Sequence, residues 1–243
     1  MAYRIGIDVG GTFTDFTLLR ESDGQVSFHK VASTPRDPSQ AIGQGIADLL
    51  GMHDIAAGEV GHIGHGTTVA TNLVIERRGA LTGMLTTRGF RDVIDIGRQV
   101  RPHLFDYGVT KPPPLAAREH RIEIGERVNS RGEVLVALDE REVEAAAVKL
   151  SRAGVKSVAV CFLHSYRNPL HEQAARRVVE RLMPDAYVSV SSEVLPEFRE
   201  YERWSTTLLN AAVGPRMEAY LDSFLTRVKQ LGIAVEPFTI HSN

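Results

Sequence analysis

The chain opens with two strand-like blocks of apolar and polar positions that a glycine pair separates. An apolar run over 3–7 ends at Asp8, and residues 13–19 alternate with period two. This pattern predicts two strands, and the tight turn between them predicts an antiparallel hairpin, unlike the strand-to-helix turns of Walker and dinucleotide loops. We expect Gly10 and Gly11 to take positive φ in the turn, so that successive N–H groups converge on an anion.

Strand and helix signals alternate along the rest of the chain, which predicts an α/β fold. The predicted strands cover 26–31, a segment around 63, 81–86, 119–127, 134–138, 158–163, 187–191 and 234–240. The predicted helices cover 37–51, 68–78, 90–96, 139–154, 168–183 and 215–231. Asp139 and Glu142 are predicted to form a capping box, and Pro215 to open the last helix.

A long irregular segment interrupts this pattern between 98 and 115 and ends in three consecutive prolines. Loops of this length in compact proteins are usually functional segments or linkers. We therefore predict a glycine-turn, phosphate-binding subdomain over 1–112 and an α/β subdomain over 113–195. Residues 196–243 are expected to form a helical segment and the start of a second, missing ATPase-like domain.

The composition narrows the classes of partner and compartment. The 243 residues carry 28 basic and 30 acidic side chains without a block of like charge, so neither a nucleic acid nor a membrane partner is expected. No apolar stretch reaches the roughly 18 residues of a membrane span. Cys161 is the only cysteine and lies in an apolar run, which predicts a buried core residue and excludes an internal disulfide. We expect a cytoplasmic protein.

The first candidate site combines the glycine turn with Asp8. Asp8 stands at the end of the first strand, where its carboxylate can hold a water of Mg²⁺ beside phosphates in the turn. Thr12 and Thr14 add hydroxyl groups. The alternative is an ordinary hairpin in which Asp8 and the glycines only favour the turn.

A second candidate site is the segment His65-Gly66-Thr67-Thr68. A glycine and two hydroxyls at a helix N-terminus can form an anion pocket from free N–H groups and the helix dipole. Equally, Thr67 or Thr68 can simply cap that helix. His65 can carry a proton or, alternatively, serve as a structural hydrogen-bonding group.

Two arginines in the irregular segment are candidate substrate ligands. Arg98 and Arg101 can clamp a carboxylate or phosphate, because guanidinium groups bind such anions bidentately, or they can be surface charges of the loop. The charged run 197–203 is interpreted as a solvated or interdomain helix end. The histidines share no ligand-like spacing, so no metal cage is expected within the chain.

Several segments taken together carry a family resemblance. They are Asp8–Asp15 (DVGGTFTD), His65–Asn72 (HGTTVATN), Thr87–Asp92 with Ile96–Arg98, His164–Tyr166 and Ser192–Arg203. The combination resembles the N-terminal part of the hydantoinase/oxoprolinase family over essentially the whole chain. That family includes ATP-dependent 5-oxoprolinases, N-methylhydantoinases and subunits of acetone and acetophenone carboxylases.

The resemblance implies a ribonuclease H-like fold similar to actin, sugar kinases and chaperone ATPases, here as an N-terminal half with an appended βαβ subdomain. It implies ATP and Mg²⁺ as cofactors and phosphorylation of a lactam, imide or ketone oxygen before ring opening or carboxylation. The backbone-binding residues for phosphate would be Gly10, Gly11, Thr12, Phe13 and Thr14, with Asp8 orienting the metal water. Expected partners are a lactam, hydantoin or ketone substrate and a second copy or a second hydantoinase-type subunit.

One departure from the superfamily pattern limits this reading. The superfamily carries a second Asp-led glycine turn in its other domain, and no other Asp-x-Gly-Gly occurs in this sequence. We therefore expect half a nucleotide site and an N-terminal fragment that is inactive alone. A ketone carboxylase subunit, a sugar- or acetate-kinase-like ATPase and a non-catalytic binding module stay open as alternatives.

Overall fold

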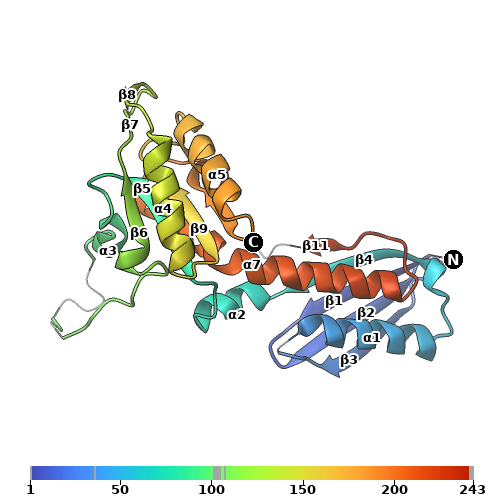
Figure 1. The fold of residues 1–243 in the computed structure, drawn as a ribbon. Helices are drawn as coiled ribbons and strands as arrows, with labels where there is room; N and C mark the ends of the chain where they lie inside the picture. Colours follow the sequence, from blue (N-terminus) through green and yellow to red (C-terminus); the bar gives the residue numbers. More distant parts are fainter. Residues whose placement is uncertain (1, 36, 101–104, 107, 241–243) are drawn as a thin grey trace. The chain divides into compact units, whose positions relative to one another are not determined.

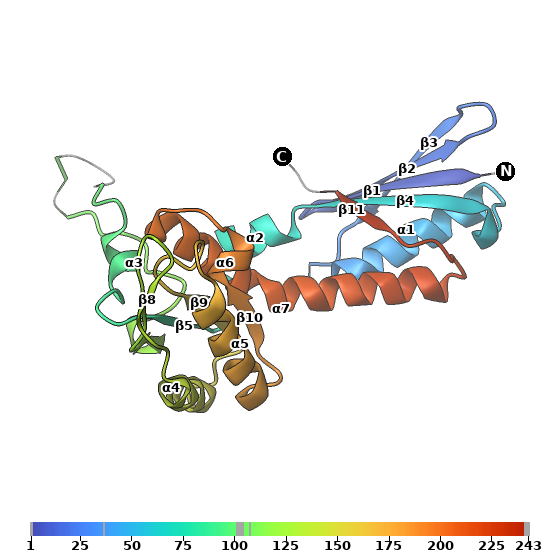
Figure 2. The same cartoon turned by 90° about the horizontal axis from the view of Figure 1, so that it is seen from above.

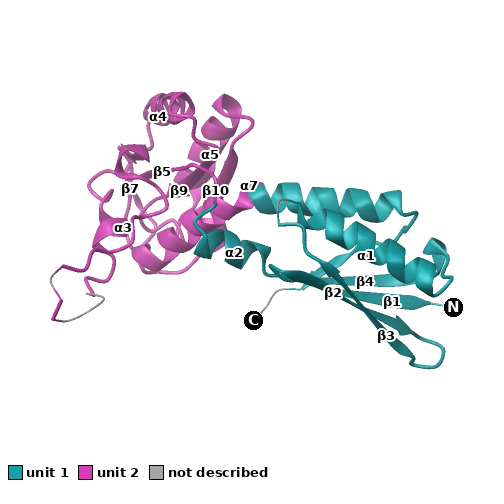
Figure 3. Cartoon of the chain, turned by 90° about the horizontal axis from the view of Figure 1, so that it is seen from below, with its two compact units in different colours: residues 1–78, 216–243 teal, residues 79–215 magenta. Residues whose placement is uncertain are grey.

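The computed structural model describes residues 2–35, 37–100, 105–106 and 108–240 (Figure 1). Two compact units make up the chain (Figure 3). Unit 1 comprises Met1–Arg78 with Arg216–Asn243, and unit 2 comprises Gly79–Pro215. Each unit has its own sheet and its own core, and each is described by itself.

Unit 1 is built on a five-stranded mixed sheet. Its strands, in spatial order, are β11 (Phe238–Ile240), β4 (Val60–Thr67), β1 (Tyr3–Val9), β2 (Phe13–Arg20) and β3 (Val26–Ala32). The pairs β1–β2 and β2–β3 are antiparallel, which confirms the predicted hairpin, whereas β4 runs parallel to β1 and to β11. Figure 2 shows β11 beside β4. Because β1 and β4 are parallel neighbours, both end at the same edge of the sheet.

Helices α1 (Pro38–Met52) and α2 (Val69–Ile75) follow β3 and β4 in unit 1. The predicted start of α1 is confirmed, since the Asp37 side chain accepts from the Ser39 N–H at 3.2 Å and Pro38 takes the first turn. The helix runs through Gly51, where it was predicted to end, and the chain turns instead at Asp54 with φ of 50°.

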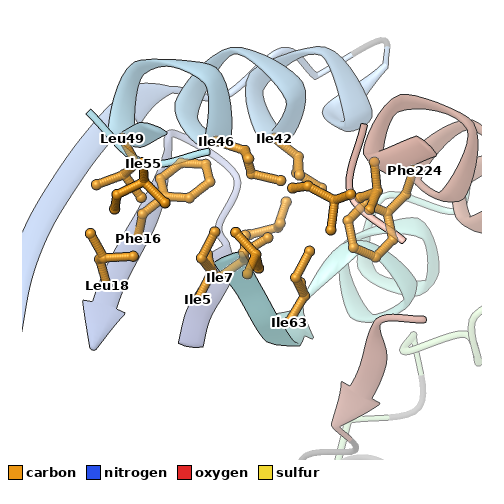
Figure 4. Close-up of a cluster of buried hydrophobic side chains, with 14 of the residues drawn as sticks. Ile5, Ile7, Phe16, Leu18, Ile42, Ile46, Leu49, Ile55, Ile63 and Phe224 are labelled. Atoms are coloured by element: carbon orange, nitrogen blue, oxygen red, sulfur yellow. The ribbon is translucent and has the colours of Figure 1, made fainter. Parts of the chain in front are cut away.

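The core of unit 1 lies between one face of its sheet and the helices α1 and α7 (Glu200–Gln230) (Figure 4). Alternate strand residues such as Ile5, Ile7 and Phe16 point into it. Gly45 leaves room for the aromatic ring, because a Cβ there would lie 2.2 Å from Phe16. The close contact of α1 with β2 therefore depends on this glycine.

Unit 2 contains a four-stranded parallel sheet. Its strands, in spatial order, are β10 (Tyr187–Val190), β9 (Ser157–Cys161), β5 (Thr82–Thr87) and β6 (Arg121–Ile124). Helices α4 (Glu140–Arg152) and α5 (Leu170–Leu182) pack on one face. The region of α3 (Val93–Ile96) and the first half of α7 pack on the other. The remaining elements are the hairpin β7 (Arg127–Val128) and β8 (Val134–Val136), α6 (Ser191–Val194), and two short 3₁₀ turns, Ala57–Glu59 in unit 1 and Arg118–His120 in unit 2.

Cys161 is fully buried in unit 2, and burial raises the pKa of its thiol well above the ordinary value. The sequence-based expectation of a core residue is confirmed. None of the described helices combines the length and the apolar character needed to cross a bilayer.

The last helix differs from its prediction. It begins at Glu200 instead of Pro215, and the proline lies inside it. An internal proline removes one helical hydrogen bond, but the first half of α7 is held by burial of Trp204, Leu208 and Ala211. Tertiary packing therefore extends the helix through a residue that sequence rules place at a helix start.

The predicted capping box is also wrong in one part. Asp139 accepts from the Arg141 N–H at 2.9 Å as a cap should. Glu142 instead accepts from the Gly125 N–H at 2.7 Å and pairs with Arg88 at 2.8 Å. Its carboxylate thus joins α4 to the segment after β6 and not to its own helix start.

The predicted subdomain limits at 112/113 and 195/196 both fall inside unit 2. The reason is strand pairing: β5 precedes the proline segment, yet it lies between β6 and β9 in one sheet. The long loop therefore connects two neighbouring strands of a single unit. The predicted strand over 234–240 is shorter in the structure, where β11 covers its last three residues.

Candidate functional site

The glycine turn, residues 10–12, lies at the edge of the unit 1 sheet where β1 and β4 end. The Gly10 N–H donates to the Phe13 carbonyl at 3.0 Å and closes the turn. Ser33, just after β3, donates its hydroxyl to the Gly10 carbonyl at 2.7 Å and its N–H to the Thr12 carbonyl at 2.9 Å. The buried Thr14 hydroxyl lies 2.9 Å from the Ser33 hydroxyl. These bonds fix the turn, and sequence reasoning missed Ser33.

Neither glycine of the turn has the predicted positive φ. Gly10 is needed for a steric reason instead, since a Cβ there would lie 3.0 Å from the Phe13 carbonyl oxygen. A Cβ on Gly11 would meet only the Asn72 side-chain amide, at an ordinary contact distance of 3.5 Å. The two glycines therefore differ: one permits the turn, and the other leaves space open beside it.

Two main-chain donors of the turn are available to a ligand. The N–H groups of Gly11 and Thr12 have no acceptor among the described residues, and both residues are exposed. Adjacent free N–H groups in a turn form a concave binding place for an anion. The Gly10 N–H and the Thr14 hydroxyl are engaged within the protein, so of the predicted phosphate ligands Gly11 and Thr12 have the most accessible donors. Phe13 is exposed, with the Lys30 ammonium 5.1 Å from its ring centre.

Asp8 projects from the face of the sheet that is turned away from α1, because burial alternates along β1. Its carboxylate lies beside Gly66, where a Cβ would be 3.8 Å from Asp8 Oδ1. Asp15 is its neighbour across the β1–β2 pair and is neutralised by Lys30 at 2.9 Å. Asp8 itself has no cationic partner among the described residues.

This arrangement at Asp8 fits a hydrated magnesium ion. Mg²⁺ prefers oxygen ligands and keeps several waters, so one exposed carboxylate beside bound phosphates suffices to orient it. No cluster of three metal-ligating side chains occurs in the described part of the chain, so a site made wholly of protein ligands is absent there.

His65 lies on the opposite face of the same sheet. It is fully buried, its Nε2 is 2.5 Å from the Tyr220 hydroxyl, and its ring packs 4.7 Å from the Phe224 ring. Burial lowers the pKa of His65 from 6.5 to about 4, although the charge of Asp8 acts in the other direction. The ring is therefore neutral near pH 7. This favours a structural role for His65 over the role of a proton carrier.

The hydroxyls of Thr67 and Thr68 are both engaged. Thr67 Oγ1 accepts from the Val69 N–H at 3.1 Å, and Thr68 donates its hydroxyl to the Val9 carbonyl at 3.2 Å. The first bond satisfies the N–H of Val69, the first residue of α2, from the residue before the N-cap Thr68, and the second ties the end of β4 to the end of β1. The Thr67 hydroxyl is therefore used at the start of α2, which favours the structural alternative over an anion pocket for this residue. Gly66, which has no side chain, leaves the space beside the Asp8 carboxylate open.

A cleft of about 520 Å³ opens in unit 1 beside the glycine turn. Gly10 and Gly11 form one wall, and Asn72 on α2 and Arg216 on α7 belong to others. The lining is completed by residues 33–35, the start of α1, and further side chains of α2 and α7. The resemblance marks Asn72 within a motif, whereas nothing in the sequence singles out Arg216.

Arg98 belongs to unit 2, where it pairs with Glu202 at the start of α7. Its predicted companion Arg101 lies outside the described residues. The structure thus places Arg98 beside Glu202, near the end of the charged run 197–203, a segment that the sequence did not connect with it.

The charged run contains a buried cation that sequence reasoning missed. Arg203 is fully buried and donates to the Phe162 carbonyl at 3.1 Å, the Glu197 carbonyl at 2.7 Å and the Ser191 hydroxyl at 3.1 Å. The same hydroxyl donates to the buried Glu172 at 2.7 Å. Burial raises the pKa of Glu172, while the surrounding donors act against that rise. Of the two interpretations of this run, as a solvated or an interdomain helix end, the solvated one is therefore wrong at Arg203.

A mixed sheet whose opening hairpin carries a glycine turn, followed by a parallel strand with its own glycine–hydroxyl segment, defines an actin-like ATPase-type fold. Comparison with solved structures agrees. The ATP-dependent caprolactamase of Pseudomonas jessenii superposes with a TM-score of 0.87 at 36% identity, over 97% of this chain and 35% of that one. Nucleotide-free acetone carboxylase gives a TM-score of 0.86 at 26% identity, over the same shares.

Sequence comparison identifies the family. A model of the hydantoinase/oxoprolinase N-terminal region matches residues 4–183. Caprolactamase subunit alpha of Pseudomonas jessenii is 41% identical over 239 residues, which are 95% of this chain and 34% of that protein. The chain belongs to the hydantoinase/oxoprolinase family and spans about a third of the length of the curated relatives that it matches first.

Proposed function

We propose that this chain is the N-terminal part of an ATP-dependent hydrolase of cyclic amides, in which unit 1 holds the terminal phosphates of the nucleotide. The observation that carries this proposal is the pair of free N–H groups at Gly11 and Thr12. They stand at the edge of the sheet where β1 and β4 end, with the unpaired Asp8 carboxylate on the adjoining strand. Family membership and the similarity to an enzyme named as an ATP-dependent caprolactamase support it.

Each residue of the turn has a defined part in this proposal. The N–H groups of Gly11 and Thr12 donate to phosphate oxygens, and the Asp8 carboxylate orients a water of Mg²⁺. Arg216, which has no carboxylate partner among the described residues, adds positive charge to the cleft wall. ATP, when bound, supplies the phosphoryl group that turns an amide oxygen into a leaving group. The chain's own contribution is alignment and charge stabilisation.

The rest of the enzyme is expected to come from further polypeptide. The relatives that the chain matches first are about three times as long, and the caprolactamase protein is named as a subunit. We propose that the functional enzyme is a homo-oligomer or contains a second hydantoinase-type subunit. The substrate is then a small lactam, imide or hydantoin. A ketone carboxylase subunit is the second candidate, which the similarity to acetone carboxylase supports.

Gly11→Ala tests the phosphate site. A methyl group at this position meets only the Asn72 amide at 3.5 Å, so folding is preserved while the space beside the free N–H groups is filled. We expect the dissociation constant of an unhydrolysable ATP analogue with Mg²⁺, measured by NMR titration, to rise at least about tenfold. Asp8→Asn is expected to weaken binding with Mg²⁺ more than binding without it.

Gly58→Ala is the matched control, because nothing lies within 4 Å of a Cβ at that position. Equal nucleotide affinities for Gly11→Ala, Gly58→Ala and the unmodified chain would refute the phosphate site. In the complete enzyme, stimulation of ATP hydrolysis by lactams supports the hydrolase. Stimulation by a ketone with bicarbonate, and not by lactams, selects the carboxylase.

A further inference from the structure

A second cleft, of about 570 Å³, lies entirely within unit 2. It lies where the parallel strands β5, β6 and β9 end, since its walls include Phe90 after β5, Arg127 after β6 and His164 after β9. Ligands of open parallel sheets bind in the crevice at the carboxyl ends of the strands. The volume is in the range of small-molecule sites. This cleft therefore has the position and the size of a binding site.

The charges in the lining favour an anion. The cleft is lined by three arginines, Arg98, Arg127 and Arg199, and by two carboxylates, Glu200 and Glu202. Arg98 is neutralised by its ion pair with Glu202. Two guanidinium groups and one carboxylate remain, which leaves an excess of positive charge.

Arg127 is the strongest candidate ligand. It is half-buried, and its guanidinium packs 4.8 Å from the centre of the Phe90 ring. No carboxylate lies within ion-pair distance of it among the described residues. A half-buried cation without a counter-ion is costly unless a ligand supplies one. Stacking on an aromatic ring also fixes the guanidinium plane, which prepares it for bidentate contact with a carboxylate.

The backbone around the cleft is held in uncommon conformations. His164 and Arg199 are non-glycine residues with positive φ, of 54° and 76°, and both line the cleft. His164 Nδ1 is also buried without a hydrogen-bond partner among the described residues. Such conformations persist where surrounding contacts enforce them, and they concentrate at binding sites. Here the enforcing contacts include the buried Arg203, which ties the start of α7 to the segment after β9.

We propose that this cleft binds a small organic carboxylate whose acid group pairs with Arg127 and whose compact, partly apolar body lies against Phe90, Val93 and Leu163. Nothing in the proposed nucleotide site requires this second site, because the two clefts belong to different units. A test of carboxylate binding in unit 2 is therefore independent of a test of nucleotide binding in unit 1.

A matched pair of probes tests the carboxylate. Cyclopentanecarboxylate and cyclopentanecarboxamide have the same ring and nearly the same shape, and only the first is charged. Trp204, the single tryptophan, is buried in unit 2 close to the Glu200–Glu202 wall, so its fluorescence reports on this cleft. We expect saturable binding of the acid and at least about tenfold weaker binding of the amide, confirmed by calorimetry.

Variants of the 243-residue chain assign the site to Arg127. Arg127→Gln is expected to weaken acid binding at least about tenfold, and Arg131→Gln, at an exposed turn position, to leave it within about twofold. Glu200→Gln removes the remaining opposing charge and is expected to tighten binding two- to threefold, roughly. Because an unfolded variant would not bind the acid more tightly, tighter binding by Glu200→Gln cannot result from loss of folding. Circular dichroism confirms that each variant is folded.

Equal affinities for the acid and the amide, or equal effects of Arg127→Gln and Arg131→Gln, would overturn the proposal. So would the absence of saturation by the acid. Inorganic phosphate serves as a third probe. If phosphate alone saturates the fluorescence change and Arg127→Gln abolishes it, the carboxylate assignment is overturned in favour of a phosphoryl ligand.

Discussion

Protonation of His65 is expected to make the stability of unit 1 fall steeply as pH is lowered from 7 to 5. The imidazole is fully buried against Tyr220 and Phe224, and its pKa in the folded state is about 4, compared with an ordinary value of 6.5. Between these values the unfolded chain binds a proton that the folded chain excludes. Stability therefore rises with pH through this window and is complete above pH 6.5.

The magnitude follows from the two pKa values. The full difference corresponds to about 3 kcal/mol of unfolding free energy, and about 2 kcal/mol of it is lost between pH 7 and pH 5. His65→Gln keeps a side chain that can bond to the Tyr220 hydroxyl but cannot be charged. We expect the variant to lose about 2 kcal/mol less than the unmodified chain over this range.

Urea unfolding, followed by far-ultraviolet circular dichroism at several pH values, measures this difference. His62→Gln is the matched control, because His62 is on the same strand but exposed on the other face. It is expected to leave the pH dependence of the unmodified chain nearly unchanged. Parallel curves for His65→Gln and the unmodified chain would refute the assignment of a buried, neutral imidazole.

Four further outcomes follow from packing. Gly45→Ala places a Cβ 2.2 Å from the Phe16 ring and is expected to lower the unfolding free energy by about 1–3 kcal/mol. Gly51→Ala, in the same helix with nothing within 4 Å, is expected to raise it by about 0.5–1 kcal/mol. Cys161 should stay unreactive toward a thiol reagent until the chain is denatured, and a native-state reaction would contradict its burial. Arg203→Met should lower stability by roughly 3 kcal/mol in urea titrations, because the buried network around it loses its cation; no change would contradict that role.

Features of the fold that depend on local signals were predictable from the sequence. The period-two pattern of β1 and β2 specified an antiparallel hairpin, and Asp37-Pro38 specified the start of α1. The glycine turn was recognised, but the positive φ values predicted for its glycines were wrong. Glycine is needed at position 10 because a Cβ there would clash with the Phe13 carbonyl oxygen.

Features that depend on long-range packing were not predictable in this way. The residues between Glu200 and Pro215 show no clear helical apolar stripe, so the sequence did not join them to the helix predicted from Pro215. Burial of Trp204 against the unit 2 sheet stabilises the helix there. Arg203 looks like a surface charge in the sequence, since its carbonyl acceptors come from segments up to 41 residues away. The second cleft was missed for the same reason, because its arginines are brought together only by the parallel sheet.

The register of β1 and β4 decides which candidate residues can act together. Ile7 pairs with His65 and Asp8 with Gly66, so the period of two places His65 in the core and Asp8 on the other face. A shift of one residue would bring the two together only by burying the Asp8 carboxylate among apolar side chains, which is prohibitively costly. A proton carrier working beside Asp8 must therefore come from the outer face of the sheet or from further polypeptide. This requirement agrees with a chain that spans about a third of the length of the relatives that it matches first.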